Sequence, residues 1–150
     1  MGHTRMTTQG SEKKNRNNYP FRGNAGGAAF ALAHNGVLYN DAALRGKLHL
    51  PRTKIETDSY IAVQLIERQK ALHLDSLAYM AEQVEGSFSF AVLDERDNLY
   101  FVKGDNPLCI YRYPKLGLLL YASTEGILRG ALERLKFPLE QPEQIGRAHV

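Results

Sequence analysis

The sequence contains a single cysteine and no tryptophan among its 150 residues. One thiol, at Cys109, excludes an intrachain disulfide and argues against a cysteine-based metal cluster. The histidines lack the spacing of metal ligands; they are His3, His34, His49, His73 and His149. We therefore expect no metal, no other cofactor, and a reducing, cytoplasmic location.

Long hydrophobic runs are absent as well. The longest aliphatic stretch, around Leu116 to Ala122, is far too short to span a membrane. The polar N-terminus has no apolar core of a signal peptide. Hydrophobic residues make up 43% of the chain and charged residues 23%, which is ordinary for one globular domain. We expect no membrane partner.

The net charge of +3 is mild and lies partly in the first stretch of the chain. This stretch contains one acidic residue, Glu12, and five basic residues: Arg5, Lys13, Lys14, Arg16 and Arg22. Such a basic loop could contact phosphates. No aromatic platform or nucleic-acid-binding motif accompanies it, so a solvated loop is the better interpretation and no nucleic-acid partner is expected.

Both ends of the chain look unnatural. Met1 leads directly into a motif with no strand before it, and the last six residues, 145–150, fit no helix or strand pattern. Those six residues can be encoded by the start of a widely used sequencing adapter. We expect a gene fragment with a domain over residues 1–138 and a tail over 139–150, non-native at 145–150. The alternative is a genuine disordered tail.

The pattern of the chain predicts an α+β fold with antiparallel sheets. Residues Met6–Gly27 are expected to form a loop, and His34-Asn35-Gly36 a turn between two short strands. Further strands are expected at Ser87–Leu93, Leu99–Lys103, Leu108–Tyr113 and Leu118–Ala122. Helices are expected at Asn40–Leu48, Ser59–Lys70, Ser76–Val84 and from Ser123 to about Leu135. Asn40, Asp58 or Thr57, and Ser123 are the expected N-caps.

Three short segments contain polar groups that could bind a small zwitterion. Arg5 offers a guanidinium fork for a carboxylate. Asn35 and the backbone N–H of Gly36 offer two neutral donors, which suit an oxyanion hole. Asp58 offers an anion for an ammonium. Together they could hold both charged ends of an amino acid and polarise an amide, as hydrolysis of a glutamine side chain requires.

Several motifs in order resemble those of class II glutamine amidotransferase domains of the Ntn-hydrolase superfamily. Gly2-His-Thr-Arg-Met-Thr-Thr-Gln-Gly10 is similar to the family's G-H-T-R-W-A-T-H-G. Ala33-His-Asn-Gly-Val-Leu-Tyr-Asn40 is similar to V-H-N-G-x-x-x-N. Weaker matches follow the same order: Asn18-Tyr-Pro-Phe21, Glu56-Thr-Asp-Ser59, Gly86-Ser-Phe-Ser-Phe-Ala91, Asp105-Asn-Pro-Leu108 and Ala122-Ser123. The resemblance implies an αββα sandwich of antiparallel sheets, incomplete at the N-terminus.

The resemblance also implies roles for single residues. Arg5 would bind the α-carboxylate of glutamine and Asp58 its α-ammonium, while Asn35 and Gly36 would stabilise the oxyanion. Thr8 and Gln9 would lie in the loop that folds over glutamine. An N-terminal cysteine of the family attacks the amide, its α-amino group acts as the base, and the ammonia passes to a synthase domain or subunit.

The chain departs from the family at several positions. Met1 precedes the arginine motif and is not at the position of the nucleophile, so this chain is expected to be inactive by itself. The family's tryptophan is Met6 and its histidine is Gln9. From the residues alone, Asn35-Gly36 could be a simple turn, Arg5 a solvated charge and Asp58 a helix cap.

Three other functions remain open. The complete protein could be a catalytically dead glutamine-binding or regulatory domain. It could also be the glutaminase part of an amidophosphoribosyltransferase. Finally, Cys109 could act as a thiol nucleophile with His34, but its place inside an apolar strand favours an inert buried side chain.

Overall fold

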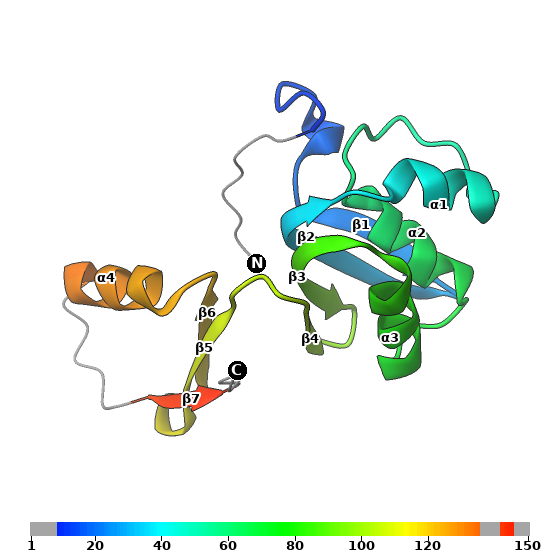
Figure 1. Cartoon of the computed structure of the whole chain (residues 1–150). Helices are drawn as coiled ribbons and strands as arrows, with labels where there is room; N and C mark the ends of the chain where they lie inside the picture. Colours follow the sequence, from blue (N-terminus) through cyan, green and yellow to red (C-terminus); the bar gives the residue numbers. More distant parts are fainter. Residues whose placement is uncertain (1–8, 136–141, 146–150) are drawn as a thin grey trace. The chain divides into compact units, whose positions relative to one another are not determined.

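The computed structural model of the chain describes residues 9–135 and 142–145. These residues form two compact units that divide after Asp105. Each unit has its own sheet (Figure 1). Each also has its own hydrophobic core. The expected α+β class and the antiparallel sheets are confirmed.

A four-stranded antiparallel sheet forms the centre of the first unit. Its strands lie in the order β1 (Phe21–Ala25), β2 (Ala28–Leu38), β3 (Gly86–Asp94) and β4 (Leu99–Lys103). The expected strands at 87–93 and 99–103 are therefore confirmed. Because β2 and β3 are the central pair, each of them has a hydrogen-bonded strand along both of its edges.

The expected loop over Met6–Gly27 is wrong at its end, where Phe21–Ala25 form β1. A two-residue connection joins β1 to β2, and both of its residues, Gly26 and Gly27, have positive φ angles of 63° and 99°. Glycine adopts this conformation at little steric cost, so the pair closes a tight hairpin. Phe21 and Ala25 are buried at the two ends of the strand and anchor it.

The expected turn at His34-Asn35-Gly36 is also wrong, because β2 continues through it to Leu38. His34 lies opposite Phe90, Asn35 opposite Ser89, and Gly36 opposite Phe88. Pairing with β3 over this whole length satisfies the backbone of β2 without a reversal of the chain. The Asn-Gly pair therefore lies within a strand.

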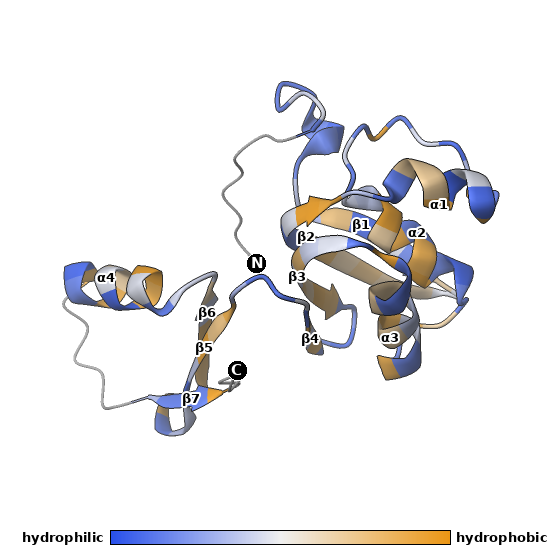
Figure 2. Cartoon of the chain, viewed as in Figure 1, coloured by the Kyte–Doolittle hydropathy of each residue, from blue (hydrophilic) through white to orange (hydrophobic). Residues whose placement is uncertain are grey.

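Three helices complete the first unit: α1 (Asp41–Lys47), α2 (Tyr60–Arg68) and α3 (Leu74–Gln83). A short 3-10 turn, η1 (Asn15–Asn17), precedes β1. Helix α2 packs against β1 and α3, and six consecutive residues, Ile61 to Ile66, are buried. Figure 2 shows apolar residues concentrated in α2 and the sheet.

The expected helices exist, but their caps differ. The Asn40 side chain does not cap α1; it donates to the Gln83 carbonyl at 2.9 Å and accepts from the Glu85 N–H at 3.0 Å. Helix α3 begins earlier than expected because the His73 imidazole accepts from the Ser76 N–H. The Asn40 side chain thus links the start of α1 to the end of α3, whereas His73 caps its own helix.

The second unit contains β5 (Cys109–Tyr113) between β6 (Leu118–Ala122) and β7 (Glu143–Ile145), with α4 (Glu125–Leu135) packed on β5 and β6. A short turn, η2 (Pro114–Leu116), joins β5 to β6. Strand β7 was not expected from the sequence. The hydroxyl of Thr124, not that of the expected Ser123, accepts from the first turn of α4. Among the described residues, no helix is both long and apolar enough to cross a membrane.

Candidate functional site

Four of the six predicted site residues lie in the described part of the chain. Arg5 and Thr8 lie outside the described residues, and Gln9 is the first residue inside them, with an exposed side chain. Asn35 and Gly36 lie on β2, and Asp58 lies in the segment before α2. The structure brings this segment against the end of β2.

The contact between Asp58 and β2 is direct. The Asp58 Oδ2 atom accepts from the backbone N–H of Leu38 at 2.7 Å, two residues beyond Gly36. The alternative that Asp58 caps a helix is wrong, because Ser59 occupies the N-cap position of α2 and no side chain bonds there. The carboxylate is instead fixed beside the strand that carries the predicted oxyanion donors.

Asp58 is a buried acidic side chain, with 3% of its surface exposed. Among the residues that the structure describes, it forms no ion pair with a cation. A buried carboxylate is costly unless hydrogen bonds and an opposite charge compensate it. Within the described residues, hydrogen bonds from Leu38 and Ser59 offset this cost.

The hydroxyl of Ser59 joins three side chains beside Asp58. Its Oγ atom lies 2.7 Å from the Nδ1 atom of His34 and 3.3 Å from the Oδ1 atom of Asp58, and it also bonds the Tyr19 hydroxyl. An ionised carboxylate only accepts, so Ser59 donates its one proton to Asp58. Tyr19 and His34 must then both donate to Ser59.

Replacing Ser59 with alanine should therefore lower the free energy of unfolding by about 2–3 kcal/mol, since buried donors lose their acceptor. Chemical denaturation followed by circular dichroism measures this difference. Ser87→Ala is the matched control, because within the described residues the Ser87 hydroxyl makes no hydrogen bond. Equal unfolding free energies for the two variants would contradict the role given to Ser59.

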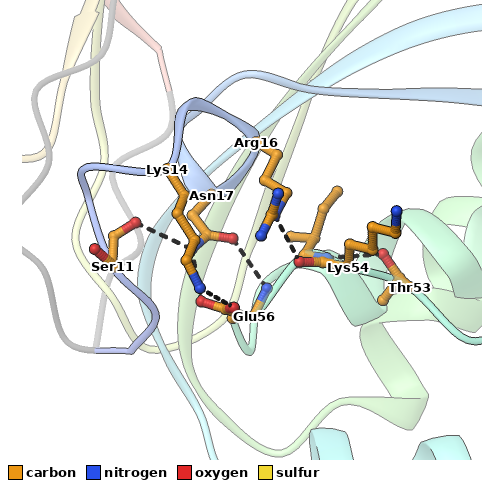
Figure 3. A network of polar contacts seen from close by, with 8 residues as sticks. Ser11, Lys14, Arg16, Asn17, Thr53, Lys54 and Glu56 are labelled. Carbon is orange, nitrogen blue, oxygen red and sulfur yellow. Dashed lines mark hydrogen bonds and ion pairs between the residues drawn. The ribbon is translucent and has the colours of Figure 1, made fainter.

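Two further contacts hold the segment before Asp58. The Arg45 guanidinium of α1 donates to the Thr57 carbonyl at 3.4 Å and to the Gln64 side chain at 3.0 Å. The buried Asn17 side chain bonds Glu56 through both its oxygen and its nitrogen (Figure 3). Residues 56–59 are thus fixed by β2, α1 and the chain before β1.

Gly36 has a φ angle of 138°, which side chains rarely adopt. A Cβ atom there would lie 1.9 Å from the carbonyl oxygen of Ser87 on β3. The close approach of the two strands therefore requires glycine at this position. The neighbouring Asn35 side chain is exposed, on the opposite face of the strand from the buried His34.

Sequence reasoning missed four residues that organise this region: Asn17, Tyr19, His34 and Ser59. A histidine at the end of the apolar run Ala28–Ala33 was a usable signal, because a buried imidazole needs a hydrogen-bond partner. Nothing in the local sequence marks Asn17 among the neighbouring asparagines.

Cys109 lies in β5 of the second unit and is buried. Burial, together with the nearby Glu125 carboxylate, raises the pKa of its thiol above the ordinary value. Because the thiolate is the nucleophilic form, these surroundings disfavour catalysis by Cys109. Within residues 9–135 and 142–145, no cluster of three histidine, cysteine or acidic side chains is placed to hold a metal ion.

Comparison with protein families matches residues 3–129 to the glutamine amidotransferase domain. Glutamine–fructose-6-phosphate aminotransferase of Lactococcus lactis is 33% identical over 117 residues, covering 73% of this chain and 19% of that protein. The same enzyme of Streptococcus agalactiae serotype V is 33% identical over 131 residues, with the same coverage. The chain thus spans about a fifth of the length of these relatives.

Two solved structures have a similar fold. Glutamine phosphoribosylpyrophosphate amidotransferase from B. subtilis superimposes with a TM-score of 0.66 at 22% identity, over 81% of this chain and 26% of that one. A structure described as the allosteric regulatory enzyme of purine biosynthesis gives a TM-score of 0.56 at 23% identity, over 65% and 22%. The chain therefore shares its fold with these two amidotransferase-like structures over the parts that superimpose.

Proposed function

Because the chain belongs to the class II glutamine amidotransferase family, we propose that its first unit binds L-glutamine as a zwitterion. In the complete protein the domain would hydrolyse the side-chain amide to glutamate and ammonia. The ammonia would pass to a synthase domain or subunit. Residues 1–138 are proposed to form this domain, and 139–150 a tail whose Glu143–Ile145 segment pairs with β5.

The observation that carries the proposal is the burial and the hydrogen bonding of Asp58. Its carboxylate is buried, is held by Leu38 and Ser59, and has no cationic partner among the described residues. A substrate ammonium would supply the missing charge. Hydrogen bonds to charged groups contribute about 1.5–3 kcal/mol each, which is enough to select an amino acid over the same amide without an α-ammonium.

The other roles follow from the order of the motifs and from β2. Asn35 and the N–H of Gly36 would stabilise the tetrahedral oxyanion, close to the end of the strand that holds Asp58. Arg5 would bind the α-carboxylate, and Thr8 and Gln9 would lie over the substrate. These assignments are proposals drawn from the family resemblance.

Titration of the 150-residue chain with L-glutamine, followed by calorimetry or NMR, tests the proposal directly. We expect saturable binding of L-glutamine and about 100-fold weaker binding of 4-carbamoylbutanoate, which is glutamine without its α-ammonium. Equal affinities for the two ligands would remove the ammonium site from the proposal.

We expect the 150-residue chain to bind glutamine without hydrolysing it. Its one thiol, Cys109, is buried in a strand, and its raised pKa keeps it protonated at neutral pH. A coupled assay for glutamate measures hydrolysis, with Cys109→Ser as the control. Release of glutamate that disappears in Cys109→Ser would make Cys109 the nucleophile and contradict this prediction.

Two alternatives concern the complete protein. A binding-only regulatory domain would keep Asp58 and Gly36 and lack the thiol that the reaction needs. A partner that accepts ammonia could be a sugar-phosphate aminotransferase, as in the relatives at 33% identity, or a phosphoribosyltransferase, as in the B. subtilis structure. A cytoplasmic location stays a prediction from the sequence.

A further inference from the structure

Asn17 uses both ends of its carboxamide to join two segments that are distant in the sequence. Its Nδ2 atom donates to the Ser11 carbonyl at 3.0 Å and to the Oε2 atom of Glu56 at 3.1 Å. Its Oδ1 atom accepts from the Glu56 backbone N–H at 3.0 Å. The side chain is fully buried, so these bonds lie away from water.

The two joined segments each lead to a residue of the proposed glutamine site. Ser11 lies two residues after Gln9, and Glu56 lies two residues before Asp58. Gln9 belongs to the loop proposed to cover the substrate, and Asp58 is proposed to bind its ammonium. The length of the Asn17 side chain therefore limits how far these two parts of the site can separate.

Two exposed contacts connect the same two segments, and they contribute less than Asn17. Lys14 forms an ion pair with Glu56, and the Nε atom of Arg16 donates to the Lys54 carbonyl at 3.0 Å. The bonds from Lys14 and Asn17 hold the pKa of the Glu56 carboxyl below its usual value, so Glu56 accepts from Asn17 as an anion. Ion pairs at exposed positions contribute little, which leaves Asn17 as the main link.

We propose that Asn17 is a positioning residue that sets the spacing between the Gln9 loop and Asp58, and thereby the affinity for an ammonium-bearing substrate. This inference rests on the proposed function. An amide of this length supplies two donors and one acceptor. Aspartate has the same size but no donors, and it would face the Glu56 carboxylate at close range.

The test compares two ligands in matched variants of the 150-residue chain. The ratio of the Kd for 4-carbamoylbutanoate to the Kd for L-glutamine reports the contact with the ammonium alone. We expect Asn17→Asp to lower this ratio by about tenfold, because the two segments are no longer joined. A variant that only loosened the fold would weaken the binding of both ligands and leave the ratio unchanged.

Two further variants sharpen the comparison. In Asn17→Asp combined with Glu56→Gln, carboxylate and amide exchange places. The bonds to residue 56 are restored, but the Ser11 carbonyl still lacks its donor, so the ratio should recover only part of its value. Asn18→Asp is the control, because Asn18 donates to the Glu12 carbonyl within its own loop. Asn18→Asp should therefore keep the wild-type ratio.

The outcomes separate this inference from the proposed function. Suppose that Asp58→Asn lowers the ratio to about one while Asn17→Asp keeps the wild-type ratio. The role of Asn17 is then overturned and the ammonium site stands. If Asp58→Asn leaves the ratio intact, the ammonium site is wrong and the role of Asn17 is overturned with it. Should Asn17→Asp not fold, Glu56→Ala removes one of the three bonds, and an unchanged ratio there also overturns the inference.

Discussion

Replacement of Gly36 by alanine should lower the free energy of unfolding by more than about 4 kcal/mol. The φ angle of 138° is unfavourable for any residue with a side chain, and the added methyl group would lie 1.9 Å from the Ser87 carbonyl oxygen. Neither strand can move aside easily, because β2 and β3 are the central pair of the sheet. Chemical denaturation measures the loss.

Gly46→Ala is the matched control for this prediction. Gly46 lies in α1, and a Cβ atom there meets no atom within 4 Å. Alanine in a helix should raise the free energy of unfolding by about 0.5–1 kcal/mol, so the two glycine variants have opposite expected signs. If Gly36→Ala were as stable as the wild type, the close approach of β2 and β3 would be wrong.

The elements with regular hydrophobic spacing were predictable from the sequence. Strands β3, β4 and β6 and helices α2 and α4 lie within a few residues of their expected positions. In β3, Phe88, Phe90 and Val92 alternate along one face and are buried. Local sequence is sufficient in such cases because the same face that sets the pattern also forms the core.

The first hairpin could not be predicted in this way. Strand β1 is rich in polar residues and buries only its two ends, so its composition is that of a loop. At Asn35-Gly36 the local preference for a turn was overridden by pairing with β3, which is about 50 residues distant in the sequence. Long-range pairing decided both elements.

The candidate site was only partly open to sequence analysis. Asn35, Gly36 and Asp58 lie in short motifs, so the resemblance proposes them directly, and their roles stay predictions. The residues that hold them act through contacts across long sequence separations: Tyr19 bonds Ser59 at a separation of 40 residues, and Asn17 bonds Glu56 at a separation of 39. No local pattern records such a contact, so only the fold identified these residues.

Replacement of Asp58 by asparagine should weaken the binding of L-glutamine by about 100-fold, since an ion pair with the substrate ammonium is lost. The fold should survive, because an amide oxygen can still accept from the Leu38 N–H. The binding of 4-carbamoylbutanoate should change little, because that ligand has no ammonium. Calorimetric titration of both ligands measures the two effects in one protein preparation.

Asp75→Asn is the control for Asp58→Asn, because Asp75 is exposed in the first turn of α3 and its loss gives the same change in net charge. Its affinity for L-glutamine should equal that of the wild type. An equal loss in both variants would mean that net charge, not the position of Asp58, controls binding. A loss confined to Asp58→Asn, with an unfolding free energy within about 1 kcal/mol of the wild type, would show that the buried carboxylate serves the substrate, because a purely structural role would lower stability and leave the discrimination between the two ligands unchanged.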